Sequence, residues 1–179
     1  MRLVKASSVV ADDFLRWLDD VPIPEGQAVL VPHERLLAEP GLLRRAAPTG
    51  VIWPNDRRVS ELAPHLDRLA LIALVFPVFK DGRAFSQARI LREQYGFFGE
   101  LRAIGQVLRD QFLFMLRAGF DAFEVTKDAD AAAFAEAARR YSVFYQPTAD
   151  GRCTALDARQ HRAPAMAPQP VADEAVPCA

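Results

Sequence analysis

The chain has 179 residues, 51% of them hydrophobic and 25% charged, so it can bury one substantial core but not two full domains. Its formal net charge is −1 and no run of Lys and Arg exceeds two residues, which excludes the electrostatic footprint of a nucleic-acid-binding protein. The longest unbroken apolar run, residues 69–79, is far shorter than the ~20 residues of a membrane-spanning helix, so we expect no membrane contact.

The first 25 residues carry no clear strand pattern. Residues 12–18 fit a short amphipathic helix, which Pro22 and Pro24 would stop. The opening residues lack the long apolar core of a signal peptide. We therefore expect a cytoplasmic protein.

Five short β-rich runs follow, each succeeded by a helical pattern. They are residues 28–31, 51–53, 70–76, 101–104 and 122–125. Strands that alternate with helices are typical of parallel βαβ units. The third run is apolar throughout, as expected for a central strand covered on both faces. The pattern predicts an α/β fold of about five parallel strands, either an open doubly wound sheet or a partial β/α barrel.

Three helices are predicted between and after these strands. The first presents a stripe of Ala84, Ala88, Leu91 and Tyr95 and ends at Gly96. The second, over 106–118, is apolar all round at 112–116, which favours burial on more than one face or a homodimer contact. The third begins at Asp128 as N-cap and turns Phe134, Ala138 and Tyr141 inward.

Periodicity fails from Pro147 onward, where prolines interrupt an Ala-rich polar segment. The sequence therefore predicts a single α/β domain over 1–146 and a disordered tail over 147–179. Both cysteines, Cys153 and Cys178, lie in this tail, so the body can hold neither a disulfide framework nor a cysteine-bound metal or cluster.

Polar residues follow the predicted strands at the edge where ligands bind to parallel sheets. They are Asn55, Asp56 and residues 80–86, 105–111 and 126–128. Among them, the loop Asp81-Gly82-Arg83 leads directly into a helix. Free backbone N–H groups, the Arg83 guanidinium and the Ser86 hydroxyl are predicted to converge there on a small oxyanion such as sulfite, sulfate or a nucleotide phosphate.

A purely structural interpretation competes with that anion site. In it Asp81 forms an Asx turn, Gly82 supplies a positive φ, Ser86 caps the helix, and Arg83 pairs with a carboxylate, Asp110 or Glu124. Such turns are common whether or not they bind a ligand.

Arg102 lies inside a predicted strand, where an ion is unusual. It either reaches the end of the sheet to meet a ligand or pairs internally with Glu124 or Asp81. Asp110 and Gln111 lie near the start of a helix, where a carboxylate suits the helix dipole. The predicted ligand-binding set is Asp81, Gly82, Arg83, Ser86, Arg102, Asp110, Gln111 and Glu124. Its carboxylates suit acid–base work if one cleft gathers them, but no catalytic residue is assigned.

Motifs for cofactors are missing from the sequence. His33 and His65 have no partner at ligand spacing, so no metal site is predicted. No Gly-x-Gly-x-x-Gly and no Walker loop occurs, and therefore no cofactor is predicted from motifs. A flavin or NAD(P) stays open as an alternative.

Three runs carry a family resemblance: Phe76-Pro-x-Phe-x-Asp-Gly-Arg83, Gly99-Glu-Leu-Arg-Ala-x-Gly105 and Asp110-Gln111. In these runs the chain resembles the bacterial family called domain of unknown function 934, over roughly residues 28–146. Lys80 and Ala84 depart from the family pattern, which usually has a small polar residue and a second glycine there.

The resemblance implies a role in assimilatory sulfate and sulfite reduction, because members are usually encoded beside sulfite reductase. We expect an accessory protein that binds a sulfite reductase subunit or a small oxyanion at the carboxyl edge of its sheet. One alternative is an oxidoreductase that uses a flavin or a nicotinamide. A second is an interaction module whose working surface is the apolar helix at 112–116.

Overall fold

The computed structural model describes residues 2–5, 8–17, 21–127, 129–148 and 151–160. The predicted N-cap Asp128, the side chain of Ala138, Cys178 and residues 161–179 of the predicted tail lie outside the described part.

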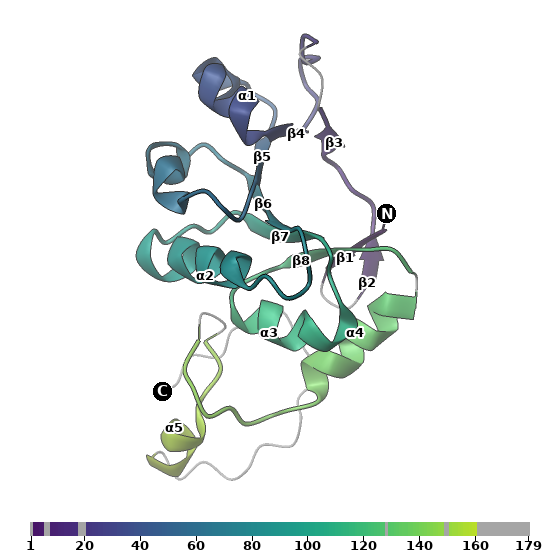
Figure 1. Cartoon of the computed structure of the whole chain (residues 1–179), viewed down its shortest axis with the longest axis vertical. Helices are drawn as coiled ribbons and strands as arrows, with labels where there is room; N and C mark the ends of the chain where they lie inside the picture. The colour runs from purple at the N-terminus through teal and green to yellow at the C-terminus, as the bar shows by residue number, and fades with distance from the viewer. Residues whose placement is uncertain (1, 6–7, 18–20, 128, 149–150, 161–179) are drawn as a thin grey trace.

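One eight-stranded sheet forms the centre of the molecule (Figure 1). Its strands are β1 (Arg2–Lys5), β2 (Ser8–Val10), β3 (Leu15–Arg16), β4 (Val29–Pro32), β5 (Thr49–Trp53), β6 (Leu71–Phe76), β7 (Glu100–Gly105) and β8 (Ala122–Val125). The order is β2-β1-β8-β7-β6-β5-β4-β3. Strands β3 to β8 run parallel, while β1 is antiparallel to β8 and β2 is antiparallel to β1.

The sheet is curled into a half-barrel. Strands β3 and β8 stand five places apart in the order, which in a flat sheet would separate them by about 24 Å. Nevertheless the Arg16 guanidinium on β3 donates a hydrogen bond to the Glu124 carboxylate on β8. The residues between β2 and β3 therefore cross the concave face, which we call the lumen.

In the described part of the chain, the helices that pack on the sheet lie on its convex face (Figure 1). They are α1 (His33–Ala38), α2 (Arg83–Arg89) with a π-helical continuation over Ile90–Gln94, α3 (Phe112–Arg117) and α4 (Ala129–Arg139). Short 3₁₀ turns lie at Pro40–Arg44, Val59–His65 and Arg109–Gln111, and α5 (Ala155–Gln160) follows the main body.

Alternation along β6 divides the core in two. Ile72, Leu74 and Phe76 point to the helices, whereas Leu71 and Ala73 point into the lumen. There they pack with Phe14 of the crossing segment, and among the described residues no helix contributes to that second cluster. β6 is thus covered by helices on one face and by the crossing segment on the other. A doubly wound sheet would have helices on both faces, so that interpretation is wrong.

The five predicted strands correspond to β4 to β8, so the α/β class is confirmed. The prediction missed β1, β2 and β3, and the helix proposed over 12–18 is wrong at its described residues. There the backbone pairs with β4 instead: the Leu15 N–H donates to the Ala28 carbonyl at 3.0 Å, and the Trp17 N–H donates to that of Leu30 at 3.0 Å.

Two predicted helices differ from the observed ones. The helix proposed over 106–118 divides into the 3₁₀ turn at Arg109–Gln111 and α3, and Tyr141 is exposed instead of facing inward. Within α3, Phe112 and Met115 are fully buried and Leu113 nearly so. Phe114 is 65% exposed, so burial in the core explains only part of the all-apolar run.

Part of the predicted tail is folded. Thr154 is buried and forms an isolated parallel bridge with Phe144. Its hydroxyl and backbone N–H both donate to the Asp157 carboxylate at the start of α5. In the described ranges, no helix has the length and apolar character needed to cross a membrane.

Candidate functional site

The loops that follow β6 and β7 start side by side at the carboxyl end of the sheet. The Gln106 N–H donates to the Phe76 carbonyl at 2.8 Å. Gly105 has a φ of 93°, and a Cβ at this position would lie 2.4 Å from the same carbonyl oxygen. Only glycine suits this conformation and this close approach, so Gly105 fixes where the second loop begins.

Two glutamine side chains clamp these loops together. The Phe79 N–H donates to Gln106 Oε1 at 3.1 Å, and Gln111 Nε2 donates to the Phe79 carbonyl at 2.8 Å. A turn bond from the Asp81 N–H to the Val78 carbonyl, 3.0 Å long, closes the first loop. The Gln111 side chain, predicted to bind a ligand, is thus bonded to the backbone of the neighbouring loop.

The clamped loops display three apolar side chains to solvent. Phe79 is 53% exposed, and Val78 and Leu108 are exposed to a similar degree. We call Val78, Phe79 and Leu108 the rim patch. Lys80 and Lys127, which follow β6 and β8 at the same end of the sheet, are exposed as well. Asp110, two residues after Leu108, is also exposed. The carboxyl end of the sheet therefore presents an apolar surface with charges of both signs beside it.

At the start of α2, the two charged side chains of the turn, Asp81 and Arg83, pair with each other. Asp81 Oδ1 accepts the Arg83 N–H at 3.2 Å, which is the Asx turn of the structural interpretation. The Arg83 Nε and Nη2 atoms donate to the same carboxylate at 3.0 Å and 2.7 Å. These bonds from Arg83, with a smaller contribution from Asn55, hold the pKa of Asp81 far below its ordinary value.

Other details of that interpretation are corrected. Gly82 has a φ of −83°, so it does not supply a positive φ, and no side chain caps α2. Ser86 is exposed on the helix. Arg83 pairs with the neighbouring Asp81 instead of Asp110 or Glu124.

Arg102 is fully buried in the lumen and is paired on several sides. Its guanidinium donates to both oxygens of Asp12, at 2.7 Å and 3.0 Å, and to Glu100 at 2.8 Å. Glu124 lies 3.6 Å away. The predicted internal pair with Glu124 is therefore present, and Asp12, 90 residues away in the chain, is a stronger partner that sequence reasoning missed.

Lys5 and Arg16 complete the lumen network by pairing with Glu100 and Glu124. The network thus joins Lys5, Arg16 and Arg102 to Asp12, Glu100 and Glu124, three positive charges to three negative ones. Beside it lies a cavity of about 280 Å³, lined by Arg2, Leu3, Asp12, Arg16 and Glu124.

The structure divides the predicted ligand-binding set between two places. Asp81, Gly82, Arg83, Ser86, Asp110 and Gln111 lie at the carboxyl rim, whereas Arg102 and Glu124 lie in the lumen. Arg102 is three residues before the end of β7, so its backbone is about 10 Å below the rim. The two guanidinium groups do not converge, and the carboxylates do not share a cleft. The exposed rim patch and the clamping Gln106 were not foreseen.

Within the described ranges, no group of three or more His, Cys, Asp or Glu residues is placed to hold a metal ion. His33 lies edge-on to the Trp53 ring, with a centroid separation of 5.6 Å.

These features define an α/β half-barrel protein with an ion-paired lumen and a rim of two clamped loops. The chain belongs to the family described as bacterial protein of unknown function (DUF934), which matches residues 50–156. The match begins later and ends later than the resemblance at 28–146 suggested. It contains the rim loops and Arg102 but not the crossing segment that carries Asp12. No curated protein matches the chain.

Proposed function

We propose that this protein is a non-catalytic accessory protein of assimilatory sulfite reduction, and that it docks on a sulfite reductase subunit through the rim patch. The pathway and the partner come from the family resemblance. The docking surface comes from one observation: apolar side chains are held exposed on two loops that Gln106 and Gln111 clamp together. Because the loops are fixed before binding, little ordering entropy is lost when a partner covers them.

Partner docking is better supported than oxyanion binding at this end of the sheet. The Asp81 carboxylate already accepts the first N–H of α2 and neutralises Arg83. A second anion there would be repelled by that carboxylate and would have to displace it. Of the two ligands expected at this edge, a protein partner is therefore better supported than a small oxyanion.

The charges beside the rim patch suggest the chemistry of the partner surface. Lys80 and Lys127 are exposed, so Asp or Glu on the partner would complement these two positions, and Lys or Arg would complement the exposed Asp110. Because rim charges act mainly on the association rate, the on-rate should fall as salt is raised.

The test is the binding of the purified full chain to purified sulfite reductase subunits, measured by biolayer interferometry. Phe79→Asp should weaken binding by roughly 10- to 100-fold, the effect of losing one buried aromatic side chain. Phe114→Asp is the matched control, because Phe114 is a 65% exposed phenylalanine on α3 and not one of the rim-patch residues. It should bind like the wild type.

Two outcomes would count against the proposal: no binding by the wild type, or equal binding by Phe79→Asp. The oxidoreductase alternative predicts instead that a flavin or a nicotinamide raises the melting temperature of the chain. Docking through the rim patch predicts no such rise.

A further inference from the structure

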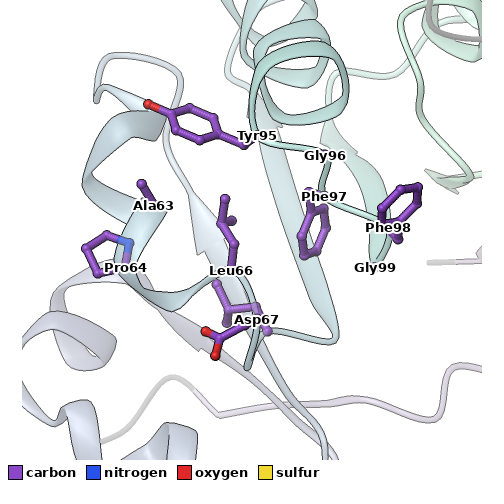
Figure 2. A pocket seen from close by; sticks show the side chains of 10 residues that line it. Ala63, Pro64, Leu66, Asp67, Tyr95, Gly96, Phe97, Phe98 and Gly99 are labelled. Atoms are coloured by element: carbon purple, nitrogen blue, oxygen red, sulfur yellow. The ribbon is translucent and has the colours of Figure 1, made fainter.

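A second exposed surface lies at the amino ends of β6 and β7, opposite the rim patch. A groove of about 720 Å³ runs there between residues 63–67 and the turn at 95–99. Its apolar lining residues include Leu66, Tyr95 and Phe97 (Figure 2). At one end of the groove stands Phe98, which is 97% exposed (Figure 2).

The turn that carries Phe98 is fixed by Arg92. The Arg92 guanidinium donates to the carbonyls on both sides of Phe98, those of Phe97 and Gly99. Its Nε also donates to the Gly119 carbonyl at 3.0 Å, which ties the turn to the next loop of the sheet.

Close packing at Gly99 restricts the same turn. A Cβ on Gly99 would lie 2.4 Å from the Phe97 ring and 2.8 Å from the Ala70 carbonyl oxygen. The fold therefore fixes the backbone that carries Phe98, while the Phe98 side chain stands in water and contributes nothing to the core. An exposed aromatic residue on a fixed turn, beside a groove of mixed polar and apolar lining, suits the role of an interface anchor.

We propose that a second copy of this chain covers this face, so that Phe98 of each copy enters the groove of the other. An anchor and a hollow lie side by side on one surface. A two-fold axis between them fills both hollows at once, which is the defining property of an isologous interface.

The groove carries a negative and a positive side chain on neighbouring residues, so the same surface on a second copy can offer each of them a partner of opposite charge. Asp67 lines the groove and its neighbour Arg68 is also exposed, with their charged groups 3.5 Å apart. A two-fold axis can set the Asp67 of each copy against the Arg68 of the other, so two copies approach without net repulsion. The rim patch stays free in such a dimer, because it lies at the opposite end of the strands.

Sedimentation velocity on the full chain, over concentrations up to about 100 μM, tests the dimer. The wild type should sediment with twice the 19.9 kDa mass of the chain at high concentration. Phe98→Asp should raise the dissociation constant by about a hundredfold, since roughly tenfold is lost for each of two anchors.

A second variant guards against misfolding of the first. Ala63→Arg fills the groove from an exposed position and should also give monomers. Phe114→Asp, on α3, should leave the dimer intact. A wild type that stays monomeric throughout, or a Phe98→Asp variant as dimeric as the wild type, would overturn the proposal.

The occupant of the groove can be identified directly. A photo-reactive phenylalanine analogue at position 98 is irradiated in a mixture of light and isotopically heavy protein. A cross-link from one copy to residues 63–67 of another supports the dimer. A link within one chain to residues 161–179 would show that the chain covers its own groove, and would refute it.

Discussion

Replacing Arg102 with alanine should be among the most destabilising changes in this chain. The side chain is fully buried and donates to Asp12 and Glu100, with Glu124 at 3.6 Å. Removing it leaves carboxylates in the lumen without their shared counter-ion. Breaking a buried ion pair from one side costs about 3–5 kcal/mol. That is a large fraction of the roughly 5–15 kcal/mol that keeps a domain folded.

Urea denaturation followed by circular dichroism measures this effect. With a slope of about 2 kcal/mol per molar urea, the midpoint should fall by roughly 2 M. Arg89→Ala is the control, since Arg89 forms an exposed pair with Glu93 one helical turn away, and such pairs contribute about 0.3–0.5 kcal/mol.

The pH dependence gives a second check on Arg102. In Arg102→Ala, Asp12 loses the bonds from Arg102 that lower its pKa, so protonation of Asp12 should relieve part of the destabilisation. The gap between variant and wild type should narrow as the pH falls towards 4. A loss of less than about 1 kcal/mol at pH 7 would refute the view that the network supports the half-barrel.

Three further predictions follow from single contacts. Burial raises the pKa of Asp12, but bonds from Arg102 and the Phe14 N–H outweigh burial and hold it below 3.8. The Asp12 carboxylate therefore stabilises the fold above pH 3.8, and this stabilisation is lost as the pH falls below that value. The free energy of unfolding of Asp12→Asn should depend less on pH in acid than that of the wild type. The same pH dependence in both proteins would contradict this. Gly105→Ala should lower stability by about 1–3 kcal/mol in thermal unfolding because of its φ of 93°, whereas an equal effect of Gly41→Ala, which meets no atom within 4 Å, would exclude that cause. Gln106→Ala should speed exchange of the Phe79 amide by roughly tenfold, and unchanged exchange would mean that the clamp is not formed in solution.

The central strands could be predicted from sequence because their signal is local. Residues 70–76 form an unbroken apolar run, and β6 (Leu71–Phe76) lies within it. β2 and β3 have no such signal, since they are three and two residues long and mostly exposed. Their pairing depends on partners elsewhere in the sheet, so neither periodicity nor composition indicates them.

The lumen shows the same limit for side chains. Arg102 is recognisable in the sequence as an unusual ion in a strand, but its main partner Asp12 lies in a segment that resembles a short helix. The apolar character of β6 indicates that both of its faces are buried. It does not indicate whether helices or the N-terminal segment of the chain pack on the second face. Exposure is equally hidden: Phe79 and Phe98 look like core residues until the turns that hold them are seen.

The pairing of Arg16 with Glu124, 108 positions apart, also bears on how the chain reaches its native state. Ribosomes add roughly 5–20 residues per second, so the first strand waits several seconds or more before its partner β8 emerges. Contacts of such long sequence separation slow folding. β3 can pair with β4 soon after both are made, but β1 cannot pair with β8 until residues 122–125 emerge. The side of the lumen that β1 and β8 close therefore stays open to water, chaperones or neighbouring chains until then.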